Sequence, residues 1–104
     1  MKQALKLGLL AVVASLASGC VSFPIEDYNL ARAAMDAARE KDAARFAPGW
    51  WYKAEEAYKQ AVRLYRERSF GPARDYFIQA RFLAEKAENT ARLEQFKTGE
   101  GLPQ

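Results

Sequence analysis

The sequence predicts an all-α fold, an antiparallel helical hairpin or a small three-helix bundle preceded by a signal peptide. Apolar side chains recur at intervals of three and four residues along three stretches of the chain, which is the spacing of one helix face. Breaks that contain Pro and Gly separate these stretches, and no stretch alternates apolar and polar residues as a half-buried strand does. The chain has 104 residues, enough for one small domain with a thin core.

The first 19 residues have the composition of a secretory signal. Lys2 and Lys6 form a short cationic region, and residues 7–17 form an apolar run of eleven residues. That run suits the core of a signal peptide and is too short to cross a bilayer as a helix. We therefore expect residues 1–19 to be removed, which leaves 85 of the 104 residues in the mature chain.

Three small residues, Ala17-Ser18-Gly19, lead directly to Cys20, the only cysteine in the chain. This stretch resembles the lipobox of bacterial lipoproteins, with Ala17 where that motif usually has Leu. The resemblance implies a lipoprotein signal peptide, a thioether-linked diacylglycerol on Cys20, and N-acylation with a fatty acid such as palmitate. Two or three acyl chains hold a protein durably on a membrane. The alternatives are a plain secretory signal with an incidental cysteine and an uncleaved N-terminal anchor.

The residue after the cysteine bears on localisation. In Gram-negative lipoproteins, Asp at this place favours retention in the inner membrane, and here the residue is Val21. The resemblance therefore implies a lipid anchor in the cell outer membrane, with the protein on the periplasmic face. Residues 20–26 would form a lipidated tether too short to hold a domain far from the lipid surface.

The composition of the mature chain argues against several classes of function. Loss of the two signal lysines leaves 14 basic against 13 acidic residues, so we expect no nucleic-acid partner. The chain has no histidine, and its one cysteine lies at the cleavage junction, so we expect no metal, no cofactor and no catalytic residues. The acidic pairs Glu55-Glu56 and Glu85 with Glu88 lie among Lys and Arg and are interpreted as solvated surface. The sequence therefore predicts that the protein is not an enzyme.

The predicted helical domain covers residues 27–97, and residues 98–104 are expected to form a flexible tail. The first helix is expected over residues 27–46, with Asp27 as its N-cap. Its core face is predicted to consist of Tyr28, Ala31, Met35 and Ala38.

Pro48 is expected to end the first helix and open a second over residues 49–68, because proline suits the first turn of a helix. Apolar residues on its core face follow a strict spacing of three and four: Trp51, Ala54, Tyr58, Ala61 and Tyr65. A flanking row widens that face: Trp50, Ala57 and Leu64.

A break at residues 69–72, capped by Ser69 or Gly71, precedes a third helix expected from Pro72 to about Lys97. Its core face has the same spacing: Ala73, Phe77, Ala80, Ala84, Ala87 and Ala91. Tyr76 and Leu83 are expected to widen this face. Small residues alternate with aromatic ones along these seams, which allows helix backbones to approach closely.

Part of the last two predicted helices resembles the core of one tetratricopeptide repeat, at Ala61, Leu64, Tyr65, Phe70, Ala73, Phe77 and Ala80. Arg68 stands where that repeat has glycine, and Glu85 stands where it has proline, so the pattern is a repeat-like hairpin. A wider pattern over about residues 25–95 resembles the DUF4398 family of small helical bacterial envelope proteins, which are often lipoproteins. It consists of the lipobox, an Ala-rich helix, and then Phe46-Ala47-Pro48, Trp51, Ala54 and Tyr58. The resemblance implies an architecture and a location and assigns no catalytic residue.

Two groups of side chains are candidate contacts to a partner. Trp50, Trp51 and Tyr52 cannot all face one core, because neighbours on a helix differ in direction by about 100°. Trp50 or Tyr52 is therefore a candidate contact, with purely structural packing as the alternative. The second group surrounds the last break and could bind phosphate groups: Arg63, Arg66, Arg68 and Arg74. Its alternative is a solvated face, since Glu67 and Asp75 partly offset the charge.

These observations predict a lipid-anchored helical lipoprotein that acts as a non-catalytic adaptor or scaffold for another cell-envelope protein. The alternative is a structural lipoprotein that binds peptidoglycan or anionic lipid directly. The expected partners are the membrane, through the lipid on Cys20, and a cell-envelope protein. The apolar seam is long for 85 residues, so a homo-oligomer that shares it is a further alternative.

Overall fold

The computed structural model describes residues 23–99, and in this part of the chain it contains four helices and no strand. The helices are α2 (Ile25–Glu40), α3 (Ala43–Phe46), α4 (Pro48–Arg66) and α5 (Phe70–Thr98). This architecture confirms the predicted all-α fold. The predicted signal peptide, Cys20 and the residues of the predicted tail beyond residue 99 lie outside the described residues.

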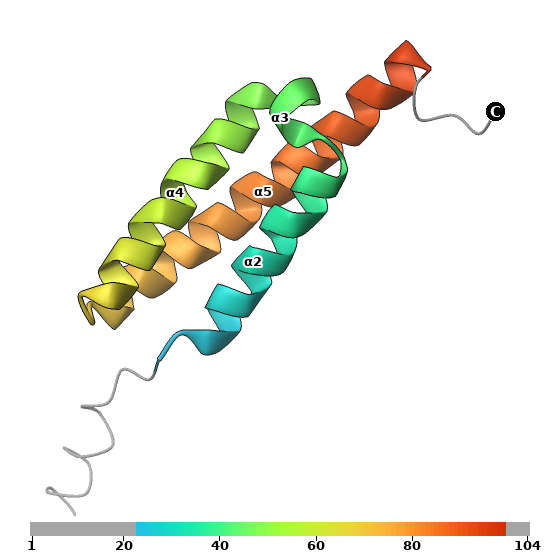
Figure 1. Ribbon diagram of the computed structural model, residues 1–104. Coiled ribbons are helices and arrows are strands. Elements are labelled where there is room, and N and C mark those ends of the chain that lie inside the picture. The colour runs from blue at the N-terminus through green and yellow to red at the C-terminus, as the bar shows by residue number, and fades with distance from the viewer. Residues whose placement is uncertain (1–22, 100–104) are drawn as a thin grey trace, which may run out of the picture.

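Helix α5 is the longest of the four, and both α2 and α4 pack along it. Figure 1 shows α2 and α4 on either side of α5, joined at one end through α3. The two flanking helices touch each other little. At the other end, the start of α2 lies beside the turn between α4 and α5, where Arg74 forms an ion pair with Asp27 at 3.1 Å.

The first helix begins earlier and ends earlier than predicted. Pro24 rather than Asp27 occupies the N-cap position, and the Tyr28 amide already donates to the Pro24 carbonyl at 2.9 Å. The helix stops after Glu40 because Asp42 adopts a left-handed backbone conformation, with φ of 55°. Aspartate tolerates this conformation better than most residues do. The short helix α3 then resumes in a new direction and buries Ala43.

The second and third helices also differ from the prediction at one end each. Pro48 opens α4 as predicted, but α4 ends at Arg66 because Arg68 is left-handed, with φ of 62°. The Ser69 amide donates to the Leu64 carbonyl at 2.9 Å, which closes the helix end. Ser69 then takes the N-cap position of α5, so α5 begins at Phe70 and its first turn accommodates the proline predicted to open it.

The core is built mainly from alanines. All six residues predicted for the core face of α5 have no exposed surface: Ala73, Phe77, Ala80, Ala84, Ala87 and Ala91. Alanines on α2 and α4 meet this row and let the backbones approach closely, as predicted. Trp51 fills the core near α3, and Phe77 is the only large side chain in the described residues that is fully buried.

Among residues 23–99, no helix combines the length and the apolar character needed to span a bilayer.

Candidate functional site

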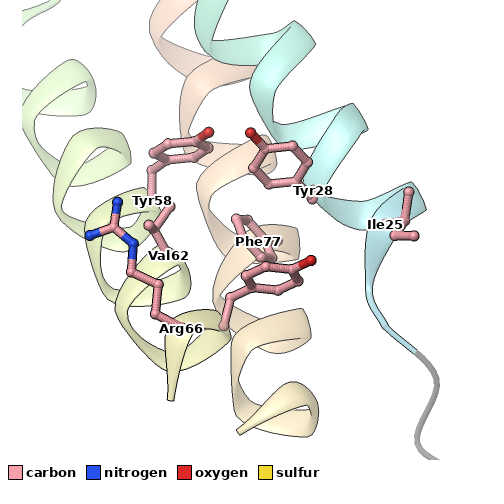
Figure 2. A pocket seen from close by; sticks show the side chains of 7 residues that line it. Ile25, Tyr28, Tyr58, Val62, Arg66 and Phe77 are labelled. Atoms are coloured by element: carbon pink, nitrogen blue, oxygen red, sulfur yellow. The ribbon is translucent and has the colours of Figure 1, made fainter. Parts of the chain in front are cut away.

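A groove opens between α2 and α4 at the end of the domain away from α3. Its volume is about 530 Å³, and its walls are mostly apolar. Seven residues line it: Ile25, Tyr28, Tyr58, Val62, Tyr65, Arg66 and Phe77. Figure 2 shows that α2 and α4 each contribute one wall, while Phe77 of α5 lies between them. The groove exists because the flanking helices pack on α5 rather than on each other.

Tyrosines give the groove a polar edge above an aromatic floor. The rings of Tyr28 and Tyr58 meet Phe77 edge-on, with centroids 5.4 Å and 5.9 Å away. Their hydroxyl groups point toward one another in Figure 2. Burial raises the pKa of Tyr58 above its ordinary value of 10.0, and the neighbouring Tyr28, through its charge and a side-chain hydrogen bond, raises it further. At neutral pH Tyr58 therefore presents an uncharged phenol to the groove.

The aromatic surface continues from the groove to the start of the described chain. Tyr65 contacts Phe77 on one side and Phe70 on the other, at centroid distances of 6.5 Å and 5.7 Å. Phe23 packs against Phe70 at 4.6 Å, although 60% of its surface remains exposed. Ile25 is exposed to a similar degree at the mouth of the groove. This end of the domain therefore displays apolar side chains to solvent.

The structure separates the two aromatic residues predicted to contact a partner. Trp50 is half-buried on α4, and its ring lies beneath the ammonium groups of Lys53 and Lys86, at 5.0 Å and 4.2 Å. Tyr52 points elsewhere and is 63% exposed. Both residues lie in the first turns of α4, about 20 Å along the helix from Arg66. They therefore do not belong to the groove.

The four arginines predicted to form one cluster fall into two classes. Arg63 bonds Glu67 at 3.2 Å and Gln60 at 2.8 Å, and Arg74 is paired with Asp27. Within the described residues, the side chains of Arg66 and Arg68 have neither an ion-pair nor a hydrogen-bond partner. The structure therefore places two unpaired cations near the turn between α4 and α5.

The predicted carboxylate pairs do not come together into an acidic site. On α5, Glu85 pairs with Arg81 at 3.0 Å, and Glu88 pairs with Arg92. No group of three His, Cys, Asp or Glu residues suited to a metal ion is found in residues 23–99.

Sequence reasoning missed the groove, although it identified most of its residues. Tyr58 and Tyr65 were predicted as part of a closed seam, yet both are only half-buried. The residue type could have indicated the groove, since tyrosine is favoured where the ring packs on apolar groups and its hydroxyl contacts water. Ile25, Val62 and Arg66 carried no signal for a groove because their role depends on how far α2 and α4 diverge.

The DUF4398 family model, described as a domain of unknown function, matches residues 26–98. The chain belongs to the DUF4398 family. The match spans α2 to α5 and so includes nearly the whole groove and both unpaired arginines, whereas Cys20 lies outside it. No curated protein and no solved structure matches the chain.

Proposed function

We propose that this DUF4398 protein is a lipid-anchored, non-catalytic adaptor that binds another cell-envelope protein through the groove between α2 and α4. The lipid is carried by Cys20, and the domain lies on the periplasmic face of the outer membrane. The observation that supports the binding role most strongly is the groove itself, an open aromatic surface on a small helical domain. The location is supported by the lipobox and by Val21.

The shape of the groove favours a helical segment of the partner. Two flanking helices on one central helix leave a fourth position of a bundle open between them. A partner helix in this position would bury apolar side chains against Val62 and Tyr65. The Tyr28 and Tyr58 hydroxyls would remain able to bond its polar groups, which is typical of tyrosine at protein interfaces.

The surface around Trp50 and Tyr52 is a secondary candidate. The ammonium groups of Lys53 and Lys86 already lie over the Trp50 ring, so a partner would have to displace them to reach the indole. The exposed Tyr52 is the freer contact. We therefore place the main interface at the groove.

The anchor is tested by mass spectrometry of the protein purified from membranes. We expect a mature chain that starts at Cys20 and carries the added mass of diacylglycerol and a fatty acid. The Cys20→Ser variant should leave the membrane fraction. An unmodified mature chain, or unchanged fractionation of the variant, would contradict the anchor.

The groove is tested with a matched pair of charged substitutions in the full-length protein. Val62→Glu places a carboxylate in the groove wall, whereas Phe82→Glu places one on the exposed face of α5. Quantitative affinity capture should recover one stoichiometric envelope protein with the wild type and with Phe82→Glu. Val62→Glu should lose that protein. Equal recovery with both variants would contradict a groove interface.

Direct binding to peptidoglycan or anionic lipid is the second candidate, and Arg66 and Arg68 favour it. Two exposed guanidinium groups without partners can bind phosphate or carboxylate groups. Arg66 also lines the groove, so this contact and the partner would lie side by side at the same end of the domain.

A further inference from the structure

The chain itself limits how far the anchor can lie from the turn between α4 and α5. Phe23 comes three residues after Cys20, so their Cα atoms are at most about 11 Å apart. Phe23 packs on Phe70, the first residue of α5. If Cys20 is lipidated, this turn is therefore confined close to the bilayer surface. The inference below therefore rests on the lipid anchor at Cys20, which is part of the proposed function.

The turn has the charges that suit an anionic surface. Residues 66–74 contain three arginines and a single acidic residue, Glu67, which is already paired with Arg63. Arg74 is bound to Asp27, so within the described part of the chain Arg66 and Arg68 are the cations of this turn that have no ion-pair or hydrogen-bond partner. Glu26 and Asp75 are exposed on neighbouring turns of α2 and α5 and limit the positive region to the turn itself.

Arg68 occupies a position that does not favour arginine. Its φ of 62° lies in the left-handed region, where a helix end usually has glycine. Within residues 23–99 the side chain gains no hydrogen bond, ion pair or ring contact that would compensate for this conformation. A ligand outside the domain that binds the guanidinium group would explain why arginine occupies this left-handed position.

Apolar side chains accompany the two arginines. Phe23 and Ile25 are both more than half exposed, and they project at the same end of the domain. Aromatic and aliphatic side chains next to cations are typical of segments that lie in the headgroup region, because rings enter the boundary while guanidinium groups bind phosphates.

We propose that the end of the domain formed by Phe23, Arg66 and Arg68 rests on the membrane and binds the phosphates of anionic phospholipids. This contact sets the orientation of the domain on the bilayer. It places the mouth of the groove at Ile25 and Arg66 beside the headgroups, so a partner must approach along the membrane surface.

The experiment uses the full lipidated protein reconstituted into phosphatidylcholine vesicles, with and without phosphatidylglycerol as roughly a quarter of the lipid. Because Cys20 is blocked by its lipid, Ser69→Cys supplies the one reactive thiol for a polarity-sensitive fluorophore. Gly49→Cys provides the matched probe at the other end of α4, where a Cβ atom meets no neighbour. Nitroxide-labelled lipids then report which end touches the bilayer.

We expect strong quenching at position 69 and little at position 49, with the difference larger in vesicles that contain phosphatidylglycerol. Each arginine near an anionic surface strengthens contact about fivefold, so Arg66→Gln with Arg68→Gln should weaken it about 25-fold. Arg39→Gln with Arg92→Gln removes the same charge from exposed ion pairs elsewhere and should leave quenching unchanged. Arg68→Gly should lose part of the quenching. Because glycine suits the left-handed position, this loss cannot be ascribed to unfolding.

Equal quenching at positions 69 and 49 on vesicle-bound protein would overturn the inference and leave the anchored adaptor intact. Binding of the arginines to purified sacculi, without quenching at position 69, would assign them to peptidoglycan and overturn it as well. A mature chain without lipid on Cys20 would overturn both this inference and the anchor.

Discussion

The ring of Phe23 lies 4.6 Å from the ring of Phe70, centroid to centroid. This contact joins the start of the described chain to the turn between α4 and α5, two segments that are far apart in the sequence. Because Phe23 follows Cys20 by three residues, it also determines which end of the domain faces the proposed anchor. The groove and both unpaired arginines lie at that end.

Phe77→Ala is expected to destabilise the domain severely. Phe77 has no exposed surface and contacts the rings of Tyr28, Tyr58 and Tyr65. Loss of a buried phenylalanine typically costs about 3–5 kcal/mol, which approaches the whole stability of a small domain. Urea denaturation followed by circular dichroism measures the change. The control Phe82→Ala, on the exposed face of the same helix, should change stability by less than about 0.5 kcal/mol.

Ala84→Leu tests whether the helices depend on small residues for their close approach. Ala84 is fully buried where α5 meets the other helices, so three additional carbons have no space. Overpacking of this kind costs about 1–3 kcal/mol. The melting temperature should fall, whereas Asn89→Leu on the exposed side of α5 should leave it nearly unchanged. An unaltered melting temperature for Ala84→Leu would show that the seam is loosely packed.

Arg68→Gly is expected to raise the free energy of unfolding by about 1 kcal/mol. The left-handed conformation is costly for residues with a Cβ atom and free of that cost for glycine. Chemical denaturation of the soluble domain measures the gain. A loss of stability would show that the Arg68 side chain makes a stabilising contact within the fold, which would remove the argument for an external ligand.

Ionisation of Tyr58 is expected to make the domain less stable in alkaline solution. The folded pKa is raised above the unfolded value, chiefly by burial and then by Tyr28. The contribution of the neutral phenol is therefore complete below about pH 10 and is lost as the pH rises from the unfolded toward the folded pKa. The free energy of unfolding, measured by denaturation across this range, should fall more with rising pH for the wild type than for Tyr58→Phe. Identical pH dependence in the two proteins would contradict the assignment.

The helices and their buried faces could be predicted from the sequence because alanine and aromatic residues follow helical spacing without interruption. The six residues that follow the spacing of three and four on α5 are buried, and Pro48 opens α4 as expected, whereas Tyr76, predicted to widen the core face of α5, is exposed. The interruption at Asp42 could not be predicted in this way. No proline or glycine marks it, and its conformation is fixed by tertiary contacts, among them the Gln95 side chain that donates to the Lys41 carbonyl at 2.6 Å.

The groove could not be predicted from the spacing of apolar residues along the sequence. Tyr58 and Tyr65 have the spacing of core residues. Whether such residues are covered depends on the angle between α2 and α4 as they pack on α5. The arginine cluster was predicted as one group, but only the positions of Asp27 and Glu67 decide which arginines are paired. The remaining two, Arg66 and Arg68, could be identified only in the folded chain.

The most direct test of the adaptor role is photo-crosslinking in living cells through the groove. A photoreactive benzoylphenylalanine replaces Ile25 or Val62 at the groove, or Phe82 on the exposed face of α5 as the control. We expect one crosslinked product with a single envelope protein from both groove positions and none from position 82. Products equally abundant at all three positions, no product at all, or only a product of the chain with itself would contradict it.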